Sequence, residues 1–280
     1  MCGIIERPVP MKNTVCLWLA CAGCLTVLPA AQAQFADSVI SYDSGSGFAS
    51  GYTDPNSALG QPSRVTPDPF GGPVDPFSPP WQSGQLVSIG TGGWLTLQFN
   101  TPILNTPSNP FGIDFIVYGN TGFIITNGNF SGGGITDGSL FSNNTGSTRV
   151  SVSADNVTYY VLNPLWAPVV DSLFPTDGSG DFHSPVNPAL TGADFAGQGL
   201  AGIRALYNGS AGGTGFDIGW AQDTEGNSVF LPSISYVKVE VLSGVSEMDG
   251  IAVVPEPTTW ALLAIGFAGL FLFRKQQRKA

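Results

Sequence analysis

The alternation of hydrophobic and polar residues predicts short β-strands along most of the chain. Leu95, Leu97 and Phe99 alternate with polar residues, which is the pattern of a strand with one buried face. Residues 148–153 repeat this period of two, and the turn-forming residues 154–156 after them predict a hairpin. The strands that we expect cover residues 94–99, 111–118, 122–125, 148–153, 157–162, 234–242 and 250–254.

The segments between these strands are rich in Gly, Pro, Asn, Asp and Ser and show no convincing helical period. Several short strands separated by turns are typical of an all-β, antiparallel β-sandwich, which we expect over residues 34–253. Residues 62–81 contain seven prolines and are predicted to form a loop without ladders. Residues 165–201 form a second, longer loop, and because loops of this length are usually either functional or disordered, we expect ligand contacts there first.

The N-terminal residues 1–33 have the three parts of a secretory signal peptide. A short basic region at residues 11–13 precedes an apolar run at residues 15–28. Ala31 and Ala33 form a small-x-small cleavage site, so cleavage is expected before Gln34. Glu6 fits this pattern poorly, and translation starting at Met11 is therefore an alternative.

The four cysteines all lie in this leader: Cys2, Cys16, Cys21 and Cys24. Cys24 follows small residues, which leaves a lipoprotein leader as a second alternative. After cleavage at residue 33 the chain has no cysteine, so neither disulfides nor a cysteine-ligated metal can stabilise it.

The C-terminal residues 254–280 combine a rigid tripeptide, an apolar run and a basic end. Pro255, Glu256 and Pro257 predict an exposed, extended segment. Residues 258–273 predict a transmembrane helix, although its fully apolar part from Trp260 is only about 21 Å long against roughly 30 Å of hydrocarbon. The tail at residues 274–280 is basic and is expected to stay on the cytoplasmic side.

This order of segments at the end of the chain resembles the PEP-CTERM sorting signal of exosortase substrates in Gram-negative bacteria. The resemblance implies that a membrane-embedded transpeptidase, the exosortase, recognises Pro255, Glu256 and Pro257, with Arg274 and Lys275 as the stop-transfer cluster. It also implies an intermediate in the inner membrane, removal of the tail, and delivery to the cell surface or extracellular matrix.

A second resemblance covers most of residues 34–253. The ordered motifs that carry it, among them GIDFIVYGN at 112–120, lie at residues 52–60, 88–97, 102–103, 112–120, 150–160, 200–202, 215–218 and 248–253. Together they are similar to bacterial secreted cell-surface proteins with a discoidin-like, galactose-binding jelly roll. The resemblance implies a structural calcium ion bound by Asp54, Asn56 and Asp249. The sequence departs from the family at Gly119, where the family tends to carry Glu, which leaves a carboxylate role at that position in doubt.

The charge of the body is strongly negative. Of the 20 acidic residues only Glu6 and Glu256 lie outside residues 34–253, and this part has four cationic side chains. Its net charge of about −14 would repel nucleic acid phosphates and attract divalent cations.

Catalytic chemistry has little support in the sequence. His183 is the single histidine, so a Ser/His triad would depend on it, and its Asp-Phe-His-Ser setting predicts a loop. The acidic residues give no indication of a facing carboxylate pair such as a glycosidase needs. We therefore expect no enzyme.

Exposed aromatic residues are candidates for glycan contact, namely Trp81, Trp166 and Trp220 in or beside the loops. The sequence thus predicts a non-enzymatic cell-surface or matrix protein processed by an exosortase. The alternatives are a carbohydrate-binding protein that binds exopolysaccharide and, third, a secreted hydrolase.

Overall fold

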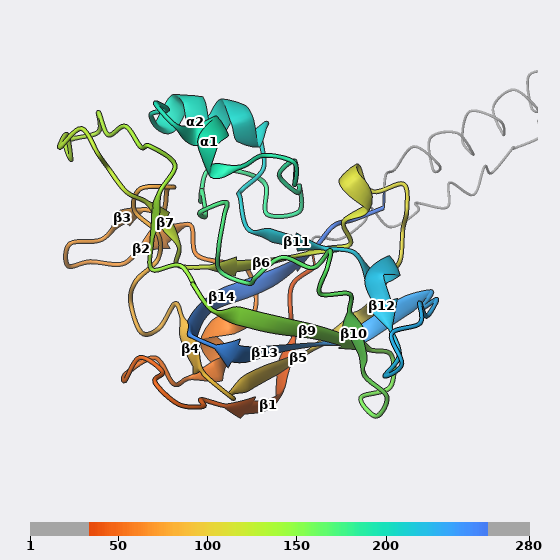
Figure 1. Ribbon diagram of the computed structural model, residues 1–280. Coiled ribbons are helices and arrows are strands. Elements are labelled where there is room, and N and C mark those ends of the chain that lie inside the picture. Colours follow the sequence, from red (N-terminus) through yellow and green to blue (C-terminus); the bar gives the residue numbers. More distant parts are fainter. Residues whose placement is uncertain (1–33, 257–280) are drawn as a thin grey trace, which may run out of the picture. The chain divides into compact units, whose positions relative to one another are not determined.

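Two antiparallel β-sheets face each other in the body of the protein (Figure 1); a computed structural model describes residues 34–256. The six-stranded sheet has the order β1 (Ser38–Asp43), β5 (Trp94–Leu104), β13 (Ser233–Ser243), β9 (Ser147–Ser153), β10 (Tyr160–Leu162) and β12 (Ala221–Gln222). The four-stranded sheet has the order β11 (Thr214–Phe216), β6 (Phe115–Gly119), β14 (Val245–Val253) and β4 (Val87–Gly90).

Short elements fill the connections between these strands. Two small ladders pair β2 (Val65–Thr66) with β3 (Gly72–Pro73) and β7 (Gly122–Phe123) with β8 (Leu140–Phe141). The helices are α1 (Gly192–Phe195) and α2 (Leu200–Tyr207), with 3-10 turns η1 (Pro55–Ala58), η2 (Pro110–Gly112) and η3 (Ile218–Trp220).

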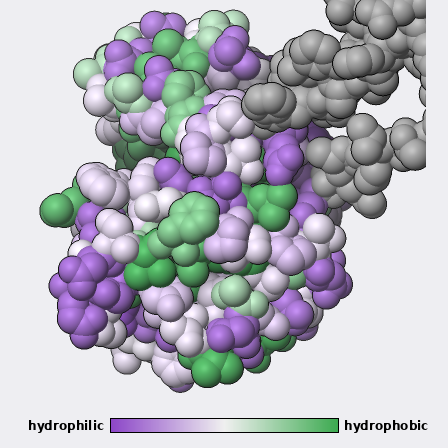
Figure 2. All heavy atoms as spheres, turned by 90° about the vertical axis from the view of Figure 1, so that its right-hand side faces the viewer, coloured by the Kyte–Doolittle hydropathy of each residue, from purple (hydrophilic) through white to green (hydrophobic). Residues whose placement is uncertain are grey.

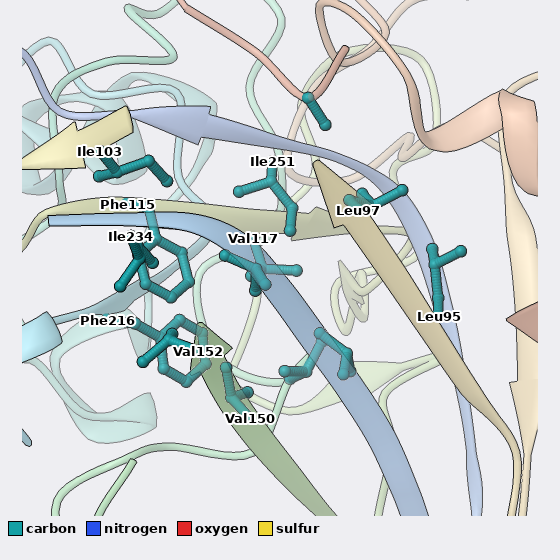
Figure 3. Packing of buried hydrophobic residues seen from close by; sticks show 14 of the residues in the cluster. Leu95, Leu97, Ile103, Phe115, Val117, Val150, Val152, Phe216, Ile234 and Ile251 are labelled. Atoms are coloured by element: carbon teal, nitrogen blue, oxygen red, sulfur yellow. The ribbon is translucent and has the colours of Figure 1, made fainter. Parts of the chain in front are cut away.

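The main hydrophobic core lies between the two sheets (Figure 3). Leu97 of β5 and Val152 of β9 come from the six-stranded sheet, and Val117 of β6 and Ile251 of β14 come from the four-stranded sheet; all are at most 1% exposed. Because each such side chain contributes about 1.5–3 kcal/mol when it leaves water, this layer supplies the main driving force for joining the sheets.

The outer face of the four-stranded sheet is also buried. Along β6, Phe115 and Val117 belong to the main core, whereas Ile116 and Tyr118 pack into a second cluster with Phe182. The Tyr118 hydroxyl donates to the Phe182 carbonyl oxygen at 2.8 Å. A third cluster includes α1, α2 and β7, and Figure 1 shows both helices on this side of the sheet. The continuous apolar run of β6 therefore reflects a strand with two covered faces.

Most predicted strands are confirmed, with shifted ends. The hairpin of β9 and β10 is confirmed, with Tyr160 opposite Val152, but β10 begins at Tyr160 rather than at 157. The reason is that Asp155 Oδ1 accepts from the backbone N–H groups of Val157 and Thr158, both at 2.9 Å, which extends the turn. The expectation for 111 was wrong because Phe111 has φ +59° within η2.

Two other expectations for the connections were wrong. Residues 62–81 do form a ladder, since Thr66 pairs with Gly72 in a two-residue ribbon that has room for Pro73 at its edge. Helix α2 was missed because it is only eight residues long, so Ile203 and Tyr207 give a single apolar repeat. β1 and β4 were also missed.

The start of the described chain lies beside its last strand. The Val253 N–H donates to the Gln34 carbonyl oxygen at 3.0 Å, and Phe35 bridges Ala252. The predicted signal peptide at 1–33, the predicted helix at 258–273, the tail at 274–280 and Pro257 lie outside the described residues. Within residues 34–256 no helix is long and apolar enough to cross a membrane.

Candidate functional site

The outward side chains of the six-stranded sheet line an open groove of about 440 Å³. Strand pairing arranges them in two rows across the sheet. The first row is Ser41 of β1, Thr96 of β5, Lys238 of β13 and Ser151 of β9. Neighbouring strands lie about 4.8 Å apart, so the floor from β1 to β10 is about 19 Å wide. A chain-like ligand can therefore lie across several strands.

The second row places an aromatic ring beside charged groups. Trp94 of β5 lies opposite Glu240 of β13, which lies opposite Arg149 of β9. The Trp94 indole N–H donates to Ser41 Oγ at 3.2 Å, and Lys238 Nζ lies 5.1 Å from the ring centroid. These contacts fix the orientation of the ring, and the other residues of these two rows are polar.

The far wall of the groove carries a second aromatic residue. Tyr159 lies just before β10, and its hydroxyl donates to Asn156 Oδ1 at 2.6 Å. Asn156 belongs to the turn after β9 and has φ +61°, a left-handed conformation that Asn tolerates better than most residues. β13 and β9 lie between the two aromatic residues, since the order is β5, β13, β9, β10.

The charges in the groove form one network. Arg149 donates two hydrogen bonds to Glu240, at 2.9 and 3.1 Å, and Lys238 Nζ lies 3.2 Å from Glu240 Oε1. Burial acts to raise the pKa of Glu240, but the hydrogen bonds from Arg149 and Lys238 outweigh it and lower that pKa. Two of the body's four cations thus meet one carboxylate, and the groove has one net positive charge in a strongly acidic protein.

The groove combines apolar ring faces with hydrogen-bonding groups, which are the two kinds of contact that a sugar can make. Aromatic rings present apolar faces, and hydroxyl, guanidinium, ammonium and carboxylate groups beside them can donate and accept hydrogen bonds. Ligand sites generally combine such apolar surface with a few polar groups that set orientation.

The three tryptophans expected from the sequence lie elsewhere. Trp220 packs against both the main and the second hydrophobic cluster, while Trp81 and Trp166 are 45% and 56% exposed but do not line the groove. On the face in Figure 2, apolar residues form small groups among polar ones, so exposure alone does not mark a site. Trp94 was not among the tryptophans expected from the sequence, although the alternation of β5 places it on the same face of the sheet as Thr96 and on the other face from Leu95.

The residues expected to bind calcium belong to two separate hydrogen-bonding groups. Asp54 Oδ1 accepts from the backbone and side-chain nitrogens of Asn56, at 3.0 and 2.9 Å, and starts η1. Asp249 lies at a bulge of β14, and its two oxygens accept from the N–H and hydroxyl of Ser63 at 2.6 and 2.9 Å. Burial raises the pKa of Asp249 to about 7. Calcium at Asp54, Asn56 and Asp249 stays a prediction, and in residues 34–256 no group of three or more His, Cys, Asp or Glu is placed to hold a metal.

His183 joins the two ends of the body. Its Nδ1 lies 2.7 Å from the Val253 carbonyl oxygen, so this nitrogen carries the proton, and its ring lies 4.8 Å from that of Phe35. The backbone N–H of His183 donates to Asp181 Oδ1 at 2.9 Å. These contacts give the residue a structural role.

The last described residues lead from the fold into the C-terminal segment. Val254 is buried, and its N–H donates to the Asp114 carbonyl oxygen at 2.9 Å, whereas Glu256 is exposed. Residues 253–279 match the PEP-CTERM protein-sorting motif. The motif indicates an exported protein that is sorted by an exosortase, a membrane enzyme, through a membrane-anchored intermediate. No match to the chain was found among curated proteins.

Because the PEP-CTERM motif begins at the end of β14, the folded body and the sorting motif meet without a linker. Val253 is the last strand residue and the first residue matched. Glu256, the last described residue, is exposed, and its recognition by an exosortase stays a prediction.

Proposed function

We propose that the body is a non-enzymatic polysaccharide-binding module, which the PEP-CTERM motif directs to the cell surface or extracellular matrix. The observation that carries this proposal is the groove of the six-stranded sheet, with the fixed Trp94 ring beside the network of Arg149, Glu240 and Lys238. The two facing antiparallel sheets also support a galactose-binding-like jelly roll. The single histidine, bonded to a backbone carbonyl, favours a binding role over a catalytic one.

In this proposal a sugar stacks on Trp94 while its hydroxyl groups bond to the polar row beneath it. Tyr159 provides a second apolar contact across the groove. The groove has a small positive charge, but the body as a whole would repel a polyanion at longer range. We therefore propose a neutral exopolysaccharide as the ligand.

The test is affinity electrophoresis of the purified full-length protein through gels that contain neutral polysaccharides. Trp94→Ala should weaken binding at least about tenfold, since the loss of 1.4 kcal/mol corresponds to a factor of ten. Trp166→Ala is the matched control, because Trp166 is exposed outside the groove.

Equal binding by wild type and Trp94→Ala, with loss in Trp166→Ala or Trp81→Ala, would contradict the groove as the site. Release of reducing sugar by the wild-type protein would instead favour the hydrolase alternative.

A further inference from the structure

A second polar cluster lies at one end of the four-stranded sheet, away from the groove. It joins Asn120 after β6, Asp171 in the long loop and Glu247 in β14. Asp171 Oδ1 accepts from the N–H and hydroxyl of Thr121 at 3.0 and 2.7 Å, and Asp171 Oδ2 accepts from the Glu247 N–H at 3.1 Å. The Asn120 side-chain nitrogen donates to the Glu247 carboxylate. Three distant segments thus bring two carboxylates and an amide together.

Gly119 makes room for this cluster. A Cβ atom at this position would lie 2.2 Å from Asp171 Oδ1 and 2.6 Å from the Glu247 carbonyl oxygen. The Asp171 carboxylate therefore packs directly on the bare backbone of β6. Asp171 itself has φ +57°, a left-handed conformation that is uncommon outside Gly but that Asp adopts more readily than most residues, and its carboxylate accepts three hydrogen bonds there.

Two side-chain atoms near this cluster are buried without a partner. Asn120 Oδ1 has no hydrogen bond, and the residue is 7% exposed. Because the nitrogen of the same amide bonds to Glu247, this oxygen lies within one amide group of that carboxylate. Asn144 Nδ2 is also unpartnered and its residue is 4% exposed, while its backbone N–H donates to the Asp171 carbonyl oxygen at 2.9 Å. A buried orphan acceptor beside two carboxylates indicates a missing ion or water.

The acid pair lacks a cationic side chain in the described part of the chain. The ion pairs there join Arg149 and Lys238 to Glu240 and Arg204 to Asp177, and Arg64 donates to backbone carbonyl oxygens. Burial raises the pKa of Asp171 to about 7 and also raises that of Glu247. Two desolvated carboxylates without a counter-charge are what a divalent cation stabilises.

Two separate spaces border the cluster. An open pocket of about 380 Å³ reaches Glu247 from solvent and is otherwise lined by Ser142, Asn143, Thr145 and Val245. On the other side, Asp171 and Thr121 border a cavity of about 10 Å³, which is close to the size of one water molecule. The first pocket therefore gives an ion access to Glu247 from solvent, and the second space lies beside Asp171.

We propose that Asp171, Glu247 and Asn120 form a calcium-binding site. Calcium takes six to eight oxygen ligands in a flexible arrangement of carboxylates, amide oxygens and waters, which suits this mixed set better than the strict octahedron of magnesium. Asn144 Nδ2 then donates to a calcium-bound water. The ion links the loop that covers the four-stranded sheet to β6 and β14, so its function is to hold this cover in place.

The experiment measures thermal unfolding of the detergent-purified full-length protein, first with EDTA and then with excess CaCl₂. Calcium at about 100 times its Kd should raise the wild-type Tm by about 5–10 °C. Asp171→Asn and Glu247→Gln should abolish this rise. Asp54→Asn should keep it, which separates this site from the early loop expected from the sequence.

Equilibrium dialysis with ⁴⁵Ca²⁺ gives a second readout, with one strongly bound ion per chain expected for wild type and none for Glu247→Gln. Glu247 is only partly buried, so this variant should fold even where Asp171→Asn does not. The proposal is overturned by a Tm that EDTA and calcium leave unchanged, which would mean water alone fills the site. It is also overturned by a calcium effect that survives Glu247→Gln or disappears in Asp54→Asn.

Discussion

The outer faces of the two sheets differ in what lies on them. On the six-stranded sheet, apolar and polar residues alternate along much of β5, β9 and β13, so their outward residues are mostly polar, and several of them border an open groove together with Trp94. On the four-stranded sheet, β6 is apolar at every position before Gly119, and its outward residues Ile116 and Tyr118 pack under the long loop at Phe182, while helices α1 and α2 pack around Phe123 of β7. Alternation therefore marks a face that stays open to solvent, whereas a continuous apolar run marks a face that the chain itself covers.

The carboxylates on the two outer faces also differ in their cationic partners. In the groove, Glu240 meets Arg149 and Lys238 in a network that water can reach. Under the cover, Asp171 and Glu247 meet without a cationic side chain from residues 34–256. The first arrangement balances a carboxylate with two cations, and the second is the one for which we propose a bound calcium ion.

The largest expected effect is on the free energy of unfolding, and it compares one variant from each outer face. Ile116→Ala removes a fully buried side chain from the covered face and should lower the free energy of unfolding by about 2–4 kcal/mol. Lys238→Ala, at an outward position of the other sheet, should change it by less than about 1 kcal/mol. Urea unfolding measures both, and equal losses would show that the two faces are covered to a similar extent.

The next effect concerns the close approach at Gly119. Gly119→Ala should cost about 1–3 kcal/mol, because its methyl group collides with Asp171 and with the Glu247 backbone. Gly84→Ala is the matched control: nothing lies within 4 Å of its added Cβ and its φ is not positive, so its stability should be nearly unchanged. Urea midpoints of the two variants measure the difference, and similar midpoints would contradict the packing described here.

Without calcium, the buried carboxylates should make the protein more stable in mild acid. The pKa values of Asp171 and Asp249 are about 7 in the folded state against about 4 unfolded. Their contribution is complete below about pH 4 and is lost as the pH rises through about 7, because the folded state holds these protons more tightly. In EDTA the Tm should therefore be several degrees higher at pH 5 than at pH 7.5. Asp171→Asn should reduce that difference, and an unchanged pH profile in the variant would contradict the burial of this group.

The smallest expected effect tests the charge network in the groove. Glu240→Gln keeps the shape but leaves Arg149 and Lys238 without their carboxylate, so binding of acidic polysaccharides should rise severalfold relative to neutral ones. Stability should change by less than about 1 kcal/mol. Affinity electrophoresis in both kinds of gel measures the ratio, and a constant ratio would mean that these charges do not face the ligand.

The sequence predicted well the strands that depend on neighbouring residues, and poorly the strands that depend on pairing with distant parts of the chain. Alternation placed β5, β9 and β13 and predicted the hairpin at 154–156, because each depends on neighbouring residues. β14 was predicted too short, since Ser246, Glu247 and Asp249 interrupt its apolar pattern. β1 and β4 gave no clear pattern of their own and are stabilised by pairing with distant strands.

The candidate sites show the same limit. Trp94 could have been placed on an outward face from the alternation of β5, but its rows with Glu240 and Arg149 depend on pairing between residues far apart in the chain. The cluster of Asn120, Asp171 and Glu247 had no sequence pattern at all. The long loop at 165–201 was the segment where ligand contacts were expected, and Asp171 is the residue that brings it to the sheet.

The location of ligand binding is tested most directly by following the indole ¹H–¹⁵N resonances of the ¹⁵N-labelled full-length protein during titration with a neutral exopolysaccharide. The resonance assigned through Trp94→Phe should move progressively and saturate, while those of Trp81, Trp166 and Trp220 should stay in place. A fixed Trp94 resonance together with a shift at Trp81 or Trp166 would contradict the assignment of the groove as the binding site.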